Sequence, residues 1–168
     1  MALRDLALLR FNYHGSDGQV HRGPMVVHRS VAHDVLSVFR TLFEARFPIE
    51  RVALARPYRR GADPNDRRSI TAAFNCRPVI TPEGPGEVFS QHAYGLAVDV
   101  NPLQNPYVGQ DGSVRNRFAR PYVDRSQDLP GMIHADDVVV RAFAAIGWSW
   151  GGRWSGDKDH MHFSLTGR

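Results

Sequence analysis

The sequence predicts one small domain that mixes helices and strands, and three observations support that class. The chain has 168 residues, 42% of them hydrophobic, which suffices for one domain with a real core. Residues 31–47 and 136–146 carry apolar side chains at helical spacing, whereas the other apolar runs are short and strand-like. No internal repeat or linker is visible. We therefore assign residues 1–168 to a single domain and expect residues 1–13 to be peripheral.

The first predicted elements are strands followed by a helix. Residues 11–29 form a strand-rich entry with a hairpin-type turn at Asp17-Gly18. The helix of residues 31–47 has Ser30 as its predicted cap, and Pro48 stops it. A short buried strand follows at residues 52–55.

The middle of the chain alternates loops with short strands. Residues 59–69 are polar and rich in Gly and Pro, which predicts an exposed loop. Residues 70–80 read as a strand that presents Arg77, and residues 81–87 as a turn. A further strand ends at Asp99.

The last third begins with a long structured loop over residues 101–131, of the kind that is often functional in a compact domain. The second helix, residues 136–146, ends at Gly147 as its C-cap. The tail, residues 148–165, is predicted to form strand and turn.

Composition limits the classes of partner. Lys plus Arg number 21 against 17 Asp plus Glu, for a net charge of +4, and the arginines form only short clusters at 59–60 and 67–68. This small excess, without interleaved aromatic residues, gives no reason to expect nucleic acid. A mildly basic surface suits a polyanion such as a bacterial cell wall, and it equally suits ordinary solubility.

Cysteine usage and the chain start bear on the compartment. Cys76 is the single cysteine, so the chain can form neither an internal disulfide nor a cysteine zinc cluster. Residues 1–10 are briefly apolar, but Arg4 and Asp5 interrupt them, so no signal peptide is visible. No run approaches the length of a membrane span. We expect a monomer without stable membrane insertion.

Two short segments supply residues with the spacing of a zinc site. The first contains His92 and Asp99, and the second, Asp157–Phe163, contains His162. Two imidazoles and one carboxylate can hold zinc in a tetrahedron and leave the fourth position for water. Water bound in that way has a pKa near about 7 and can attack a carbonyl at neutral pH.

The spacing of the first pair needs a turn. His92 and Asp99 are seven residues apart, so on one continuous strand they would face opposite ways, but Gly95 between them permits a turn. Taken singly, His92 is more simply interpreted as a loop histidine and Asp99 as a strand-end cap. Their occurrence together with a second histidine segment favours metal ligation, because ligands are commonly collected from separate segments.

The second segment offers two histidines. His160 and His162 would share a face on a strand, so either or both could bind metal. We favour His162 as the ligand, with Asp159 as the general base, which requires the chain to bend there. The simpler interpretation of His160 is a solvent-facing strand residue.

A positive group is also expected, because a zinc peptidase must stabilise an oxyanion or dock a substrate carboxylate. Arg77 is the favoured candidate, Arg67 and Arg68 compete with it, and the alternative is an ordinary surface arginine. Three tryptophans lie near the second segment. We expect Trp148 to fill the core and Trp154 to form a cleft wall that stacks on substrate.

These motifs resemble a known family. Ser90-x-His92-x-x-Gly95-x-Ala97-x-Asp99, followed by Asp159-x-x-His162-Phe163, is similar to the M15-type zinc D-alanyl-D-alanine carboxypeptidases and related wall endopeptidases, of which the Hedgehog signalling domain is a distant structural cousin. The likeness runs from about residue 14 to residue 163. Further matching segments are Ala73-Phe74-Asn75-x-Arg77, Asn101-Pro102-x-x-Asn105-Pro106-Tyr107, Gly131-Met132-Ile133 and Gly147-Trp148-x-Trp150-Gly151-Gly152-x-Trp154. His160 departs from the pattern, which usually has an aromatic or apolar residue there.

The resemblance implies a small α+β domain of the Hedgehog/DD-peptidase type, with an antiparallel sheet flanked by helices and one Zn²⁺ per chain. The implied substrates are the peptide stems of peptidoglycan, cut at D-Ala-D-Ala or at an L-Ala-D-amino-acid bond. The implied roles are metal ligation by His92, Asp99 and His162, acid–base catalysis by Asp159, carbonyl polarisation by Arg77 and a substrate-side position for Ser90.

We therefore predict a zinc-dependent D-Ala-D-Ala carboxypeptidase that works in the cell wall, the periplasm or outside the cell. Because no signal peptide is visible, this location requires another export route or a leader removed from the numbered chain. The alternatives are an L-Ala-D-Glu type wall endopeptidase, a different zinc hydrolase such as an amidase, and a non-catalytic zinc-containing wall-binding module. Asp159 argues against the last, because a purely structural site needs no base.

Overall fold

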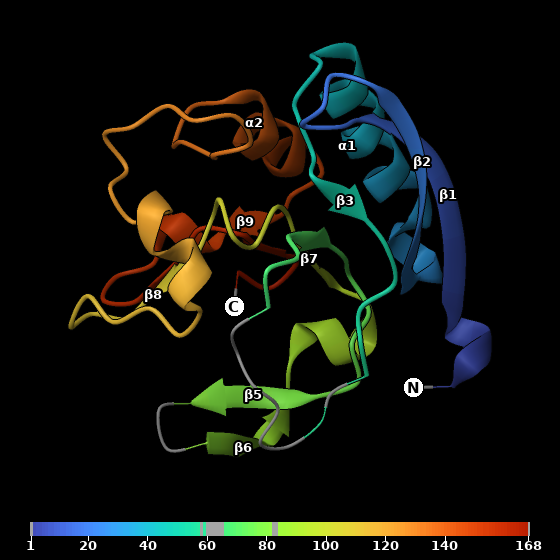
Figure 1. The fold of residues 1–168 in the computed structure, drawn as a ribbon. Helices are drawn as coiled ribbons and strands as arrows, with labels where there is room; N and C mark the ends of the chain where they lie inside the picture. The colour runs from blue at the N-terminus through green and yellow to red at the C-terminus, as the bar shows by residue number, and fades with distance from the viewer. Residues whose placement is uncertain (1, 58, 60–65, 82–83, 168) are drawn as a thin grey trace.

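The structure is a computed structural model that describes residues 2–57, 59, 66–81 and 84–167 (Figure 1). Among these residues it contains two α-helices, α1 (Ala32–Glu44) and α2 (Val138–Ala145). The strands are β1 (Leu6–His14), β2 (Val20–His28), β3 (Arg51–Val52), β4 (Ile70–Thr71), β5 (Pro78–Thr81), β6 (Gly84–Phe89), β7 (Ala97–Asp99), β8 (Tyr107–Val108), β9 (Ser149–Trp150), β10 (Lys158–Asp159) and β11 (His162–Ser164). The short 3-10 helices are η1 (Leu3–Asp5), η2 (Arg29–Val31), η3 (Gln91–Tyr94), η4 (Arg117–Tyr122) and η5 (Gly151–Arg153).

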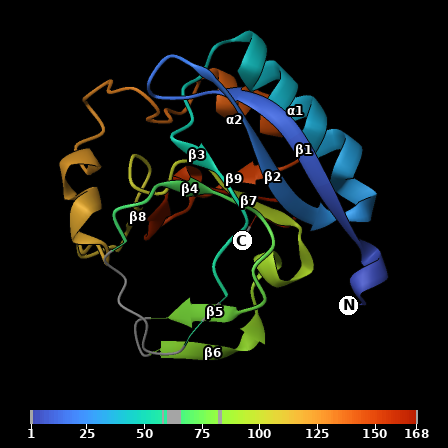
Figure 2. The same cartoon turned by 45° about the vertical axis from the view of Figure 1, so that its right-hand side comes forward.

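The chain opens with a long hairpin. β1 and β2 pair antiparallel from Leu6↔His28 to His14↔Val20, so the turn expected at Asp17-Gly18 is confirmed. The expectation that residues 1–13 are peripheral is wrong for this strand. Leu9 and Tyr13 are buried in the hydrophobic core, because alternate residues of β1 point to one face and that face is covered by α1 (Figure 2).

The two helices lie side by side over this core (Figures 1 and 2). The cap predicted at Ser30 is wrong, because a 3-10 turn precedes α1 and the imidazole of His28 accepts the backbone N–H of Ser30. Asp137 caps α2 by accepting two backbone N–H groups, and Gly147 follows the helix in the left-handed region (φ 79°) as expected. No described helix is long and apolar enough to cross a membrane.

The α+β class is confirmed, but the antiparallel sheet is divided among several small ones. The central sheet is antiparallel with the order β7-β11-β9, and the two-stranded sheets are β1-β2, β8-β10, β5-β6 and the parallel pair β3-β4. The strand predicted over residues 70–80 is interrupted, so Arg77 lies just before β5 rather than within a strand. The predicted strand 52–55 shortens to β3, and Leu54 is exposed.

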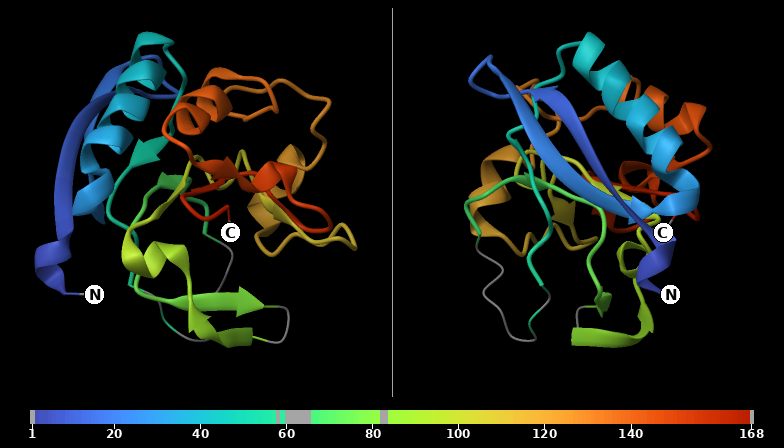
Figure 3. Two further views of the ribbon diagram at one scale, coloured as in Figure 1. Left: turned by 180° about the vertical axis from the view of Figure 1, so that it is seen from behind. Right: turned by 90° about the vertical axis from the view of Figure 1, so that its right-hand side faces the viewer.

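The β5–β6 hairpin replaces the turn predicted over residues 81–87. β6 begins at Gly84, whose φ of 123° is accessible to glycine, so the turn prediction is wrong for residues 84–87. Residues 82–83 lie outside the described residues, as do residues 60–65 of the loop predicted at 59–69. Figure 3 shows that this hairpin stands apart from the layer formed by α1, β1 and β2.

The loop after β7 is structured, as the sequence predicts for residues 101–131. Asn101 is buried, adopts φ 46°, and its amide donates to the carbonyls of Pro48 and Gly131. Asn105 is fully buried; its amide donates to Gly131 O at 2.9 Å and its oxygen accepts Ile133 N–H at 2.7 Å. The two asparagines therefore join both ends of this loop to the core.

Candidate metal centre

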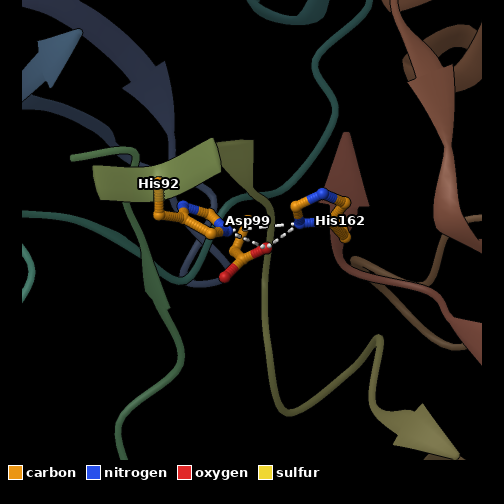
Figure 4. Close-up of side chains that lie close together, drawn as sticks. All are labelled: His92, Asp99 and His162. Carbon is orange, nitrogen blue, oxygen red and sulfur yellow. Dashed lines mark hydrogen bonds and ion pairs between the residues drawn. The ribbon is translucent and has the colours of Figure 1, made fainter. Parts of the chain in front are cut away.

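Three potential ligand atoms converge between β7, β11 and η3 (Figure 4). His92 Nε2 and His162 Nδ1 each lie 3.2 Å from Asp99 Oδ1, and they lie 3.2 Å from each other. A tetrahedral ion with ligands at about 2.0–2.1 Å separates neighbouring ligand atoms by about 3.3 Å. The three atoms thus form one face of a tetrahedron of the size that a zinc-like ion requires.

Strand pairing and a tight turn produce this convergence. β7 and β11 pair antiparallel with His162 directly opposite Asp99. His92 belongs to η3, which Ser90 caps and Gly95 closes with φ 67°. A Cβ at Gly95 would come within 2.5 Å of the backbone nitrogen of His28. The turn predicted between His92 and Asp99 is therefore present, and it requires glycine.

The contacts behind the ligands also suit a cation. His92 Nδ1 lies 2.7 Å from the carbonyl oxygen of Ala73, so it donates a proton there and turns the lone pair of Nε2 toward the cluster. Burial alone would raise the pKa of Asp99, but the facing imidazoles of His92 and His162 hold it well below its usual range. The residues present therefore fit a divalent metal ion.

His160 does not belong to the cluster. Among the described residues only His92, Asp99 and His162 form such a group. The chain bends between β10 and β11, and this bend separates the two histidines that a continuous strand would have aligned. The solvent-facing interpretation of His160 is also wrong: its ring packs 5.8 Å from that of Trp150 and is only 9% exposed. Burial lowers the pKa of His160 to about 4.

Asp159 lines the same cleft as Asp99 and His162. Its Oδ1 is buried and has no hydrogen-bond partner among the described residues. Burial, followed by the nearby charge of Asp99, raises the pKa of Asp159 to about 7, while His162 and Arg77 act in the opposite direction. A carboxyl group with a pKa near neutrality suits proton transfer at physiological pH.

The cleft, of about 440 Å³, also brings together the other predicted site residues, Arg77, Ser90 and Trp154. The indole of Trp154 donates to Gly167 O and its ring lies 5.6 Å from that of His162, so it forms a wall beside the ligands. Ser90 is buried, and its hydroxyl accepts the backbone N–H of His92. Trp148 fills the core against Phe143, as expected.

The competing arginines lie outside the main cleft. Arg67 lies over the ring of Phe118 at 4.4 Å, and Arg68 pairs with Asp66 at 2.6 Å. Neither lines the main cleft, whereas Arg77 does.

Sequence reasoning missed part of the cleft wall. Val79, Val88 and Phe89 are exposed on the β5–β6 hairpin and line the cleft, but Val79 was placed in the predicted strand 70–80 without a role, and Val88 and Phe89 were assigned to no element. Tyr107 and Arg115 also line it, from the loop after β7. Tyr107 belongs to a matching segment of the family resemblance and was given no role, and no pattern marked Arg115.

Comparison with known families agrees with this site. Residues 83–165 match a family model described as D-alanyl-D-alanine carboxypeptidase. The matched segment runs from β6 to β11, so it holds all three ligands and Asp159. This match supports the M15-type resemblance for the second half of the chain. Comparisons with curated proteins and with solved structures give no significant match.

Proposed function

We propose that this protein is a zinc-dependent peptidase that hydrolyses the peptide stem of bacterial peptidoglycan, as a D-Ala-D-Ala carboxypeptidase. The observation that carries the proposal is the convergence of the His92–Asp99–His162 cluster with Asp159 and Arg77 at one cleft, in a chain that matches this family. The cell wall is accordingly the proposed place of action.

Zinc is the proposed ion, one per chain, because two imidazoles and one carboxylate form a ligand set typical of catalytic zinc. Held by His92, Asp99 and His162, it would supply Lewis acidity that acidifies a water molecule and polarises the scissile carbonyl. The His92 ring is already fixed for this role by its hydrogen bond to Ala73 O.

The protein's own groups then move the proton and stabilise the developing charge. Asp159, on the wall of the same cleft, accepts the proton of the attacking water and passes it to the leaving amine nitrogen. The guanidinium of Arg77, on the wall of the same cleft, stabilises negative charge on the former carbonyl oxygen. Trp154 and the apolar hairpin residues Val88 and Phe89 offer surfaces for the stem peptide.

One observation favours the endopeptidase alternative. The cleft adjoins another cavity of about 510 Å³, and Ile80, Tyr107 and Arg115 line both. A groove continued in this way could accept a longer peptide on one side of the scissile bond. The two activities differ in the product released.

Mass spectrometry of purified muropeptides after incubation with the zinc-loaded protein tests the proposal, with Asp159→Ala as the control. Loss of a single terminal D-Ala, absent in the control, is the expected result. Release of a longer fragment would show that the protein is an endopeptidase or an amidase rather than a carboxypeptidase. The mass of the fragment would identify the cleaved bond. Unchanged muropeptides would contradict the peptidase and leave a zinc-containing wall-binding module as the better account.

A further inference from the structure

A second, smaller cavity adjoins the cleft at the metal centre. It has a volume of about 210 Å³, and His92 forms part of its wall. Arg77 and Asp99 line both this cavity and the main cleft. The ligand cluster therefore lies between two cavities, and a substrate bound across the cluster can place one end in the smaller one.

The charged groups of this cavity favour an anion. Arg56, Arg68 and Arg77 line it with three guanidinium groups. The opposing carboxylates are Asp66, and Asp99 of the ligand cluster. Because Asp99 faces the two imidazoles of the cluster, the rest of the wall carries a net positive charge. The small volume restricts the occupant to about one small amino-acid residue.

Arg68 is held in place at this wall. Asp66 accepts from its Nε at 2.9 Å and from its Nη2 at 2.6 Å, which uses two of the five guanidinium donors. The segment itself is fixed to the loop after β7, because Asn116 donates to Asp66 O at 2.7 Å and Arg67 stacks over Phe118. A guanidinium positioned in this way can bind a carboxylate with little loss of side-chain entropy.

Asn75 provides a second polar group in the same cavity. Its backbone N–H donates to the carbonyl of His92 at 3.0 Å, so its position is coupled to that of a metal ligand. Asn75 lines the cavity, and a side-chain amide at this position can donate a hydrogen bond to the same carboxylate.

We propose that this cavity is the subsite for the last residue of the substrate, and that Arg68, assisted by Asn75, binds the free α-carboxylate of that residue. This inference rests on the proposed peptidase function and deepens it. It restricts the substrate to peptides that end one residue beyond the scissile bond. The same site would explain removal of a terminal residue rather than internal cleavage.

The test uses two peptides, N-acetyl-L-Lys-D-Ala-D-Ala as the free acid and as its C-terminal amide. Hydrolysis is measured with the zinc-loaded protein, and equilibrium binding is measured by calorimetry with the zinc-loaded Asp159→Asn variant. We expect the acid to be preferred about 10- to 100-fold in both measurements, as for loss of a hydrogen bond to a charged group.

Variants of the wall assign the preference to Arg68. Arg68→Gln should remove this preference by weakening binding of the acid and leaving binding of the amide unchanged. Arg68→Lys should restore part of the preference. Arg51→Gln is the matched control, because Arg51 is exposed on β3 and does not line the cavity, and this variant should keep the preference. Thermal melts of each variant report whether the segment remains folded.

Equal binding of acid and amide by the parent protein would overturn the subsite, as would a preference that survives Arg68→Gln. An Arg68→Gln variant that weakens binding of both peptides alike would also overturn it, because Arg68 would then act on a part of the peptide other than its α-carboxylate. Hydrolysis of both peptides at equal rates would reject the subsite and keep the peptidase. A binding preference without hydrolysis would reject the peptidase and keep the subsite.

Discussion

His162 lies directly opposite Asp99 in the antiparallel pair of β11 and β7, and its Nδ1 is 3.2 Å from the Asp99 carboxylate. Side chains directly opposite in such a pair leave the same face of the sheet. Two of the three candidate ligands are therefore brought together by strand register alone. Only His92 arrives from outside the sheet, on η3.

The first prediction concerns metal binding. His92→Ala should lower zinc occupancy after dialysis at least about tenfold, because loss of one of three protein ligands leaves an incomplete site. Atomic absorption on dialysed protein measures this. His160→Gln is the control, since His160 lies outside the cluster, and it should keep one zinc per chain. A fully loaded His92→Ala protein would remove His92 from the ligand set.

The second prediction concerns metal removal. A ligand that binds only the folded state at 1,000 times its Kd adds about 4 kcal/mol to the free energy of unfolding. Chelation should therefore lower the Tm of the protein, as measured by calorimetry with and without chelator. The Asp99→Asn variant should show little difference between the two conditions, because it binds the ion weakly. Equal Tm values for the chelated and zinc-loaded parent protein would show that these three residues hold no ion that matters for stability.

The third prediction is a pH dependence of the metal-free protein. Burial raises the folded-state pKa of Asp159 from 3.8 to about 7, so the folded state binds the proton more tightly than the unfolded state. Below pH 4 both states are protonated and the effect is small. As the pH rises from about 4 to 7 the unfolded state gains relative stability, so folding stability falls.

The Asp159→Asn substitution removes this charge and should stabilise the metal-free protein at pH 8 by up to about 4 kcal/mol, with a smaller gain at pH 4. Urea unfolding in chelator at both pH values measures the difference. A gain of the same size at the two pH values would show that packing, and not the buried charge, is responsible.

Much of the candidate site was predictable because its residues are marked by their type and by their spacing within two short segments. The three ligands and Asp159 were read from residue type and spacing, and Gly95 marked the turn between two of them. The sequence favoured His162 over His160 but left His160 open as a ligand, because its exclusion depends on a bend at residues 160–161 and on packing against Trp150. Local spacing carries no information on such contacts.

The misassigned parts of the fold have a common cause. Gly84 and Pro85 suggested a turn, yet they begin β6 in a two-stranded hairpin that tolerates both residues at its edge. Leu9 and Tyr13 lie in the segment predicted to be peripheral, but tertiary packing under α1 buries them. The cavity at Arg68 depends on the contact of residues 66–68 with η4, which no local pattern reveals.

The fourth prediction tests Asn105, which joins the loop after β7 to the core. Asn105→Ala leaves the N–H of Ile133 and one N–H of the Arg125 guanidinium without their side-chain acceptor in a largely buried region. We expect a loss of about 3 kcal/mol in the free energy of unfolding, since each unsatisfied buried group costs about 1–3 kcal/mol. Asn12→Ala on the exposed face of β1 is the control and should change stability by less than about 0.5 kcal/mol. Similar losses for the two variants would contradict the role of Asn105.

The last prediction concerns the turn that carries His92. Gly95→Ala places a Cβ 2.5 Å from the His28 nitrogen in a backbone at φ 67°, so it adds both a clash and left-handed strain. Gly112→Ala is the matched control, because Gly112 has φ 79° but no atom within 4 Å of the added Cβ. We expect the control to lose about 1 kcal/mol and Gly95→Ala to lose about 2–3 kcal/mol.

Zinc affinity, measured by competition with a chromophoric chelator, separates strain from site geometry. Gly95→Ala should weaken zinc binding because the contact of Gly95 with His28 sets the position of η3, whereas Gly112→Ala should not. If the two variants bind zinc equally well, the turn contributes to stability alone, and the position of His92 must instead be set by its hydrogen bond to Ala73 O.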